Sequence, residues 1–493
     1  MKVMNTADLR GLLAKIDANI FKTEMCLEEL RRDRILVLRH LDEVATYPVL
    51  TLPIEITQEI FTQCLPSTAA SFSIKKLRSH PLMILLRVCR AWRDIALSTP
   101  ELWSTLCIHF DTIGPGVFIP QPGAVEAYID RWLGRAALRP LSLGFRREDA
   151  DDPLAECIFP MDRLDDLIDR YSSRLQHLEL ALSQEDICGL RLDTLDFPIL
   201  QKATFAHVFG PDPDPHNPVN TFRNAPQLHS LCLEGHAEFS YYVLPSLQLT
   251  TFEGAITDIE LFKVAPNLRT ATCFVDYLVS HTLPISPIHH SRLQSLAFVD
   301  NFEAPQDILC YLTLPALECL RISEMADTTY PSLHSFLRRS LPPLITLSIR
   351  GDNVGFSDWQ ECLSSVAATV ENLELESPSR RIQDSILYLH SCPLFCPERC
   401  KISPPLPKLK HLSFLNSTGT NYRRIKYYLK GRFDDNGLVN LQSFRVVWKY
   451  DTFLDSIFCA GEESDDITNT LKRFADAGTR IHIGTERKNY LEW

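Results

Sequence analysis

A short leucine pattern that recurs through most of the chain is the feature that most restricts its fold. The pattern L-x-x-L-x-L, with other apolar residues replacing some leucines, begins at Leu175, Leu200, Leu228, Leu247, Leu268, Leu293, Leu317, Leu344, Val370, Leu409 and Leu441. Up to Val370 these starts lie 19 to 28 residues apart. A recurrence of this kind is the signature of a solenoid of stacked repeats, in which each pattern forms one structural unit.

The alternation within each pattern predicts a buried side and an open side of the array. Successive residues of a strand point to opposite faces, so the last two apolar positions share one face and the residue between them lies on the other. The apolar positions are therefore expected to form a continuous core. Six of the intervening residues are our candidates for a substrate-binding face: Glu179, Cys232, Thr272, Arg321, Ser348 and Arg445.

The sequence also predicts where the array starts and ends, and how regular its repeats are. Leu138, Leu141 and Leu143 fit the same pattern and are predicted to start the array, and Ile481 is predicted to close it. The spacing resembles that of leucine-rich repeats, whose period is roughly 20 to 29 residues. The asparagine that ends the usual signature of those repeats occurs here only at Asn301, so the repeats are expected to be irregular.

The N-terminal segment is predicted to form a long amphipathic helix. From Leu9 to Val44, steps of four and three residues connect positions that are mostly apolar, and only Thr23 and Arg34 interrupt the row. A heptad pattern of this kind is typical of a coiled coil. Two hypotheses remain open, a coiled-coil homodimer through residues 9–44 and a single amphipathic helix that folds back on its own chain.

Between this helix and the array lies a short stretch that is rich in large apolar residues. Pro53 suits the first turn of a helix, because proline has no N–H to lose there, and apolar residues follow it at helical spacing. The same spacing returns between Leu85 and Trp92, after a polar insert. A module of this size cannot bury all of these groups internally, so we expect a partner to cover the remainder.

This stretch resembles the F-box, in the divergent form of fungal F-box-like families. The resemblance is carried by LPIEITQEIF, which starts at Leu52, and by VCRAWRDIALSTPELW, which runs from Val88 to Trp103. The chain departs from the pattern at Thr57, where a bulkier apolar residue is frequent, and in its longer insert.

The resemblance implies binding to the Skp-type adaptor of a cullin-RING ubiquitin ligase. The residues that it assigns to the adaptor-binding surface are Leu52, Pro53, Ile56, Ile60, Phe61, Leu85, Val88 and Trp92. An alternative interpretation places some of them, Trp92 above all, in the core of the module itself.

Composition disfavours several classes of protein. A net charge of -12 and a pI of about 5.7 disfavour a general binder of nucleic acid or anionic membranes. The chain has neither an apolar run near the roughly 20 residues that span a bilayer nor a signal-peptide pattern, so a cytoplasmic or nuclear location is expected. Its 15 cysteines lie mostly singly among apolar neighbours, which predicts reduced thiols rather than a disulfide framework.

Two polar clusters have residue types that occur in binding sites. Cys392, Cys396 and Cys400 follow His390 at intervals that zinc ligands could use, but prolines lie between them and paired CxxC motifs are missing, so no metal site is predicted. The basic stretch Tyr422–Phe433 could hold phosphate. We interpret it instead as an amphipathic helix with a solvated basic face.

No pattern in the chain nominates a catalytic group. Adjacent histidines such as His289 and His290 rarely make a site alone, and the chain contains no glycine-rich phosphate loop, no GxSxG and no HExxH. Neither a catalytic residue nor a cofactor is predicted.

These interpretations combine into one prediction of fold and function. The fold class is α/β, with a long amphipathic helix at residues 1–46, an F-box-like helical module at 47–110 and an irregular leucine-rich-repeat solenoid at 111–493. The leading hypothesis is a non-catalytic substrate receptor of an SCF-type ubiquitin ligase, whose array recruits a protein target. The alternative is a scaffold that uses the coiled coil and the repeats without any ligase.

Overall fold

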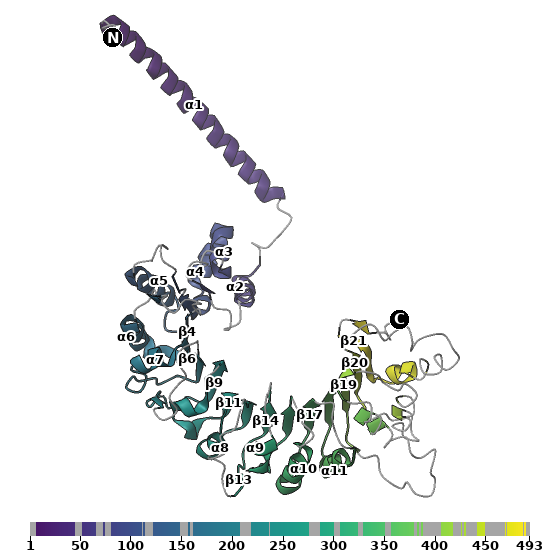
Figure 1. Cartoon of the computed structure of the whole chain (residues 1–493). Coiled ribbons are helices and arrows are strands. Elements are labelled where there is room, and N and C mark those ends of the chain that lie inside the picture. The colour runs from purple at the N-terminus through teal and green to yellow at the C-terminus, as the bar shows by residue number, and fades with distance from the viewer. Residues whose placement is uncertain are drawn as a thin grey trace. The chain divides into compact units, whose positions relative to one another are not determined.

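The computed structural model shows a mixed α/β protein (Figure 1). It describes residues 6–44, 52–65, 72–73, 80–110, 112–113, 122–147, 156–157, 161–207, 218–235, 237–275, 286–299, 306–323, 329–350, 356–378, 382–383, 386–387, 406–417, 425, 428–429, 441–448, 469, 471–486 and 488–489. The chain divides into a helical unit, Met1–Pro66 with Pro81–Leu102, and a sheet unit, Ser67–His80 with Trp103–Trp493.

The helical unit starts with one very long helix, which is followed by short ones. Helix α1 spans Thr6–Val44, and all of its side chains that the structure describes are exposed. The short helices are α2 (Ile54–Gln63), α3 (Pro81–Val88) and α4 (Arg90–Ser98), followed by the 3-10 helix η3 (Pro100–Trp103). The predicted long N-terminal helix is therefore present.

The sheet unit is built on one sheet whose strands follow one another in chain order. Its strands are β1 (Phe72–Ser73), β2 (Thr105–Phe110), β4 (Leu141–Arg147), β6 (Leu175–Leu182), β7 (Lys202–His207), β9 (Ser230–Gly235), β11 (Thr251–Ala255), β12 (Thr270–Phe274), β14 (Ser295–Phe298), β16 (Cys319–Ile322), β17 (Thr346–Arg350), β18 (Asn372–Glu376), β19 (His411–Ser417), β20 (Ser443–Trp448), β21 (Arg480–Thr485) and β22 (Lys488–Asn489). Neighbouring strands are parallel up to β21, and β22 pairs with β21 in the antiparallel sense.

Strand pairing places the same position of each pattern in one row across the sheet. Leu231 of β9 pairs with Phe252 of β11, and Leu296 of β14 pairs with Leu320 of β16. The row continues to Phe444 of β20. All five side chains are almost fully buried, because this face of the sheet packs against the helices and loops that connect the strands.

A residue at or just before the start of each of these strands extends the hydrogen-bonded ladder. Its amide N–H donates to the carbonyl of the equivalent residue in the preceding repeat at 2.7 to 3.1 Å, for example from Gln294 to Arg269 and from Ile345 to Glu318. This ladder runs from residue 176 to residue 480. Buried polar backbone groups are thereby satisfied even where the repeats differ in length.

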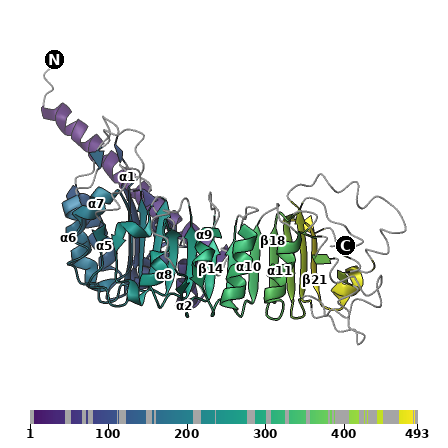
Figure 2. The same ribbon diagram turned by 60° about the horizontal axis from the view of Figure 1, so that its bottom comes forward.

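Helices lie along one side of this sheet (Figures 1 and 2). They are α5 (Pro122–Gly134), α6 (Met161–Tyr171), α7 (Gln184–Gly189), α8 (Glu260–Val264), α9 (Gln306–Cys310), α10 (Thr329–Ser340) and α11 (Phe356–Val366). The connections between strands also contain the 3-10 helices η4 (Ser172–Arg174), η5 (Phe239–Tyr241) and η6 (Ser246–Gln248). Three two-stranded sheets complete the described elements: β3 (Thr112–Ile113) with β5 (Glu156–Cys157), β8 (Val219–Asn220) with β10 (Tyr242–Val243), and β13 (Ile288–His289) with β15 (Leu312–Thr313).

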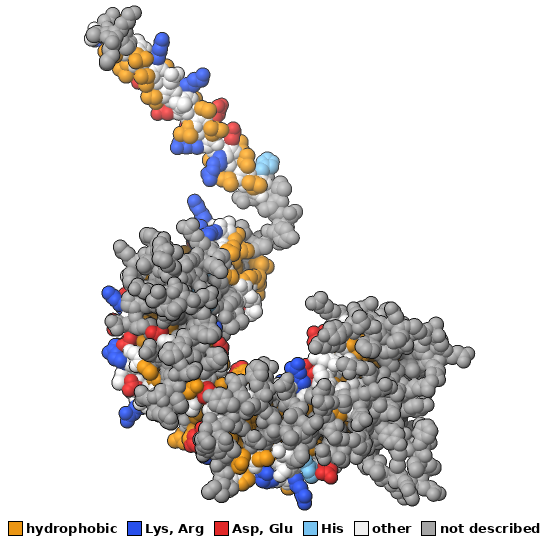
Figure 3. Space-filling model, in the orientation of Figure 1, with side chains coloured by type: hydrophobic (Ala, Val, Ile, Leu, Met, Phe, Trp, Pro, Cys, Tyr) orange, Lys and Arg blue, Asp and Glu red, His pale blue; other side chains and the backbone are white. Residues whose placement is uncertain are grey.

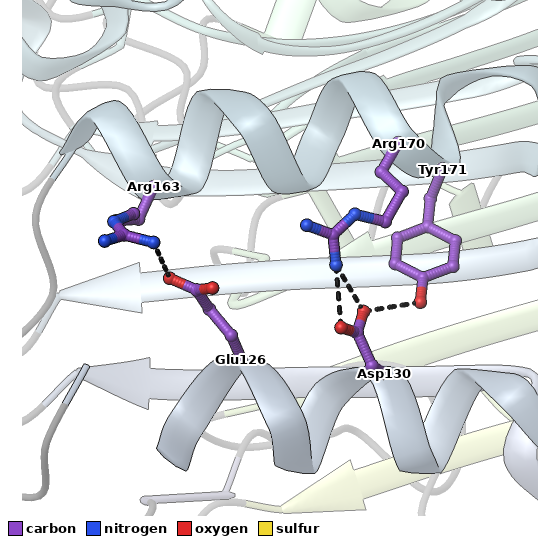
Figure 4. A network of polar contacts seen from close by, with 5 residues as sticks. All are labelled: Glu126, Asp130, Arg163, Arg170 and Tyr171. Atoms are coloured by element: carbon purple, nitrogen blue, oxygen red, sulfur yellow. Dashed lines mark hydrogen bonds and ion pairs between the residues drawn. The ribbon is translucent and has the colours of Figure 1, made fainter. Parts of the chain in front are cut away.

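Polar contacts join neighbouring helices on this side. Arg163 and Arg170 of α6 lie over α5, where Arg163 pairs with Glu126 at 3.3 Å and Arg170 with Asp130 at 2.7 Å (Figure 4). The hydroxyl of Tyr171 donates to the same Asp130 carboxylate at 2.8 Å. Exposed ion pairs are each worth roughly 0 to 1 kcal/mol, so these contacts align the two helices more than they stabilise them.

Three expectations about the register need correction. The pattern assigned to start at Leu247 is shifted, because Leu249 is fully buried at the equivalent position while Leu247 is 70% exposed. Leu138 is 93% exposed and therefore does not share the core with Leu141. The sheet also begins before the predicted first strand, because β1 and β2 precede β4. Ile481 lies in β21, the last parallel strand of the described sheet, and the antiparallel β22 follows it at the edge.

Candidate partner-binding surfaces

The start of α2 is defined by the Leu-Pro dipeptide. Pro53 stands at the N-cap, and its carbonyl accepts the amide N–H groups of Ile56 and Thr57 at 3.1 Å each. The hydroxyl of Thr57 donates to the same carbonyl at 3.3 Å, and its side chain is buried. The buried Thr57 hydroxyl is therefore hydrogen-bonded within its own helix, at a position where the F-box pattern frequently has a bulkier apolar residue.

The small core of the helical unit centres on an aromatic pair. Phe61 of α2 meets Trp92 of α4 edge to face, with ring centroids 5.1 Å apart, and Phe61 is 1% exposed. Such aromatic pairs contribute about 0.5 to 1.5 kcal/mol beyond the area they bury. Cys89 caps α4, because its sulfur accepts the amide N–H of Trp92 at 3.4 Å, and Arg93 donates to the carbonyl of Leu86 at 2.9 Å.

Exposed apolar side chains cover the outer sides of α2 and α3. They comprise Leu52, Ile54, Ile56 and Ile60 at α2, Ile84 and Val88 on α3, and Leu97 on α4. Ile56 and Ile60 are one helical turn apart, as are Ile84 and Val88, so each pair lies on one side of its helix. Figure 3 shows hydrophobic side chains gathered over this region. We call these seven residues the apolar surface.

The structure separates the eight predicted adaptor-binding residues into two groups. Leu52, Pro53, Ile56, Ile60 and Val88 are exposed, whereas Phe61 and Leu85 are buried and Trp92 is half-buried. The second group therefore holds the helices together, as the alternative interpretation has it for Trp92.

Sequence reasoning missed three members of the apolar surface, Ile54, Ile84 and Leu97. Helical spacing from Val88 could have found Ile84, because the two residues lie one turn apart on α3.

Comparison with family models identifies this region. Residues 49–109 match the model described as F-box-like, which covers α2, α3, α4, η3 and most of β2. The chain contains an F-box-like domain. F-box domains generally act in substrate recognition by SCF ubiquitin ligases and bind a Skp-type adaptor, and F-box proteins are typically non-catalytic. Comparison with curated proteins gives no match to the chain.

A second candidate surface lies on the face of the sheet opposite the buried leucine row. The six predicted substrate-face residues all fall on one row of paired positions, because the strands that carry them are aligned without a shift at this point. Arg321 and Arg445 are exposed, Thr272 and Ser348 are half-buried, and Glu179 and Cys232 are buried. We call this row the face row.

An arginine beside the face row joins three strands. Arg146 of β4 makes ion pairs with Glu179 of β6 and, at 3.1 Å, with Glu234 of β9. Burial alone would lower the pKa of Arg146, but the two carboxylates outweigh it and raise that pKa above its usual value. No pattern in the sequence signals this group, because its members are far apart in the chain.

Charge on the rest of the face row differs from one end to the other. Glu253 of β11 is exposed, whereas Arg321 and Arg445 are exposed on later strands and have no ion pair in the described part of the chain. Ser348 donates to Glu374 at 3.0 Å. Unpaired arginines can form charge-assisted hydrogen bonds with a carboxylate or phosphate of a partner.

The remaining candidates have structural roles where they are described. His290 is buried, with its ring bonded to the carbonyl of Ala265 at 3.0 Å and to the amide of Leu293 at 3.1 Å. Burial, followed by the nearby carboxylates, raises the pKa of the Cys232 thiol to about 12, so this thiol stays protonated. All cysteines in the described ranges are free.

Several expectations fall partly or wholly outside the described residues. His390 and the cysteines at 392, 396 and 400 lie outside them, and within them no group of three or more His, Cys, Asp and Glu side chains could hold a metal. Of Tyr422–Phe433 only Ile425, Tyr428 and Leu429 are described, and all three are buried. None of the described helices combines the length and apolarity that a membrane span requires.

Proposed function

We propose that this protein is the substrate-receptor subunit of an SCF-type ubiquitin ligase. Its F-box-like domain would bind the Skp-type adaptor, and the sheet unit would recruit a protein target for ubiquitination by other subunits. The observation that carries the proposal is the apolar surface, seven partly exposed side chains within a domain of a family that generally binds such adaptors.

Energetics favour a partner on this surface. Fully burying an Ile, Leu or Val side chain contributes about 1.5 to 3 kcal/mol, so covering seven that are roughly half exposed contributes several kcal/mol. Part of that gain is offset by the cost of association. The surface is therefore suited to a stable complex.

We further propose that the sheet unit is an irregular leucine-rich-repeat solenoid whose face row and its neighbours contact the target. Support comes from parallel strands in chain order and from patterns that pair position by position. The protein would contribute no bond chemistry. It would hold the target close to the transferring enzyme and so raise its effective concentration.

Two further parts of the proposal follow from the sequence. The chain is divided functionally into the helix of residues 1–46, the F-box-like module of 47–110 and the array of 111–493. The protein acts in the cytoplasm, the nucleus or both, where reduced thiols such as the buried Cys273 persist.

A binding experiment with purified Skp-type adaptor tests the proposal. The double variant Ile60→Asp, Val88→Asp would bury two unpaired carboxylates in the interface and should lower adaptor affinity more than about 100-fold. Both residues are half exposed, so the variant should remain folded, which circular dichroism checks. Leu138→Asp is the matched control, because Leu138 is 93% exposed and lies outside the apolar surface.

The result separates the receptor from the scaffold. Adaptor binding by the wild type and the control, with loss in the folded double variant, supports the receptor. No adaptor binding by the wild type would favour the scaffold that uses α1 and the sheet unit without a ligase. Equal binding by all three proteins would show that the adaptor binds outside the apolar surface and would count against the proposal.

A further inference from the structure

Helix α1 carries a long apolar row that nothing in the described chain covers. The row, called the seam, consists of Leu9, Leu13, Ile16, Ile20, Thr23, Leu27, Leu30, Arg34, Val37, Leu41 and Val44. Its described apolar members are about half exposed, and Figure 3 shows hydrophobic side chains recurring along the helix. A solvated helix of 39 residues with such a seam requires a partner helix.

We propose that the partner is α1 of a second copy, and that the two helices pair as an antiparallel coiled coil. The two helices are staggered so that the apolar layers pair Ile20 with Val37, Leu27 with Leu30 and Leu41 with Ile16, each across the two copies. Two observations select this arrangement over a parallel one, the polar residues of the seam and the charges beside it.

The polar residues of the seam fit only the antiparallel arrangement. In a parallel dimer in register, Arg34 would face the Arg34 of the second copy, and like charges in the seam repel. In the antiparallel pair each Arg34 faces a Thr23. The hydroxyl of Thr23 donates to the carbonyl of Asn19 at 2.6 Å, which leaves its oxygen free to accept a hydrogen bond from the guanidinium.

The charges beside the seam are complementary in the same stagger. Glu24 of each copy lies opposite Arg31 of the other, which gives two opposite-charge contacts near the centre of the coil. Glu24 has no ion pair in the described part of the chain, and Arg31 bonds only Glu28 of its own helix, at 2.9 Å. A parallel dimer would place Asn19 and Cys26 opposite these residues. An antiparallel stagger one heptad away would bring Glu24 against Glu24.

The arrangement has a consequence for the assembly. The two chains leave the coil at opposite ends, which a paired length of residues 13–44 sets on the order of 50 Å apart. One dimer would therefore carry two F-box-like domains and two sheet units, and neither copy depends on adaptor binding for its pairing.

Charge reversal in the full-length chain tests the proposal. Glu24→Arg and Arg31→Glu each replace two attractive contacts with two repulsive ones, so each should raise the dimer dissociation constant about ten-fold. The double variant restores opposite charges and should return the constant to near the wild-type value. Glu29→Arg, which lies off the seam, is the control that should leave it unchanged. Sedimentation velocity measures the constant, and circular dichroism checks helicity.

Cysteine cross-linking then tests orientation independently. In a Cys26→Ser background, a chain with Ile20→Cys is mixed with a chain with Val37→Cys and oxidised. The antiparallel pair predicts a disulfide between the two different chains, identified by mass spectrometry of the joined peptides. A Val37→Cys chain that joins only to itself would establish the parallel orientation and overturn the proposal. A wild-type chain that remains monomeric at micromolar concentration would also overturn it.

Discussion

Ile60 and Phe61 are neighbours in the sequence but differ in environment. Both were predicted to contact an adaptor, yet Ile60 is 43% exposed while Phe61 is 1% exposed against Trp92. Helical spacing places both residues on the apolar side of α2. It cannot tell which of the two contacts Trp92. That distinction comes from the packing of α2 against α4.

The pair therefore predicts opposite mutational effects. Phe61→Ala leaves a cavity and should lower the free energy of unfolding of the helical unit by about 3 to 5 kcal/mol. Ile60→Ala should change it by less than about 1 kcal/mol and should instead weaken adaptor binding. Urea unfolding and adaptor titration of both variants measure these effects. Equal destabilisation by the two substitutions would contradict the assignment.

His177 is expected to make the sheet unit sensitive to acid. Burial, with a smaller effect of Lys202, lowers the pKa of His177 from its usual value to about 4, and its ring contacts the Thr204 hydroxyl at 3.1 Å. Between pH 6.5 and 4 the unfolded chain binds a proton that the folded chain does not, so stability falls as pH falls. From pH 7 to 5 the loss is up to about 2 kcal/mol.

Urea unfolding measures the free energy of unfolding of the wild type and of His177→Gln at pH 7 and at pH 5, and the change between the two pH values is compared. His80, whose pKa is also lowered to about 4 by burial, is present in both proteins and cancels from the comparison. The variant should lose less stability on acidification than the wild type. Parallel losses in the two proteins would show that His177 is not the group responsible.

At the scale of elements, the tight approach of neighbouring strands explains a glycine in the sheet. A Cβ on Gly254 of β11 would lie 2.5 Å from the Cβ of Leu233, which is buried in β9 and cannot move aside. The Gly254→Ala variant should therefore lose about 1 to 3 kcal/mol of stability.

A matched control is available in α5. Gly123 is exposed with no atom within 4 Å of its would-be Cβ, so Gly123→Ala should be neutral or stabilise by up to about 1 kcal/mol. Thermal unfolding of both variants gives the comparison. A Gly254→Ala protein as stable as the control would mean that β9 and β11 are not packed as closely as described.

The leucine patterns differ in how well their spacing predicts the register of the strands. Strand pairing confirms the predicted register of the patterns from Leu293 to Val370. In each of these patterns the two core residues occupy the fourth and sixth positions, and successive patterns start 24 to 27 residues apart. At Leu247 the motif LQLTTF offers two leucines two residues apart. Both satisfy the alternation, and only pairing of Phe252 with Leu231 selects Leu249 for the core.

For the whole molecule, the face row predicts that target recruitment and adaptor binding are separable. The double variant Arg321→Glu, Arg445→Glu reverses two exposed charges on the sheet and should reduce the ubiquitin conjugates that form on bound proteins, because complementary charges steer and orient partners. Adaptor affinity should stay at the wild-type value.

Arg338→Glu provides the control, since Arg338 is exposed on α10 and outside the face row. Quantitative mass spectrometry of conjugates isolated with each variant gives the readout. Unchanged conjugates in the double variant, or an equal loss in the control, would place the target-binding surface elsewhere.

The periodic features of this protein can be read directly from its sequence. The heptad row of α1, the helical spacing that follows Pro53 and the alternation of each leucine pattern all arise from local chain geometry, which fixes side-chain direction within one element. The division of the apolar residues into core and surface, as for Phe61 and Ile60, arises only when the elements pack. The same packing brings Arg146, Glu179 and Glu234 together from three strands. Burial and ion pairing depend on neighbours distant in sequence, and those neighbours are defined only when the elements pack.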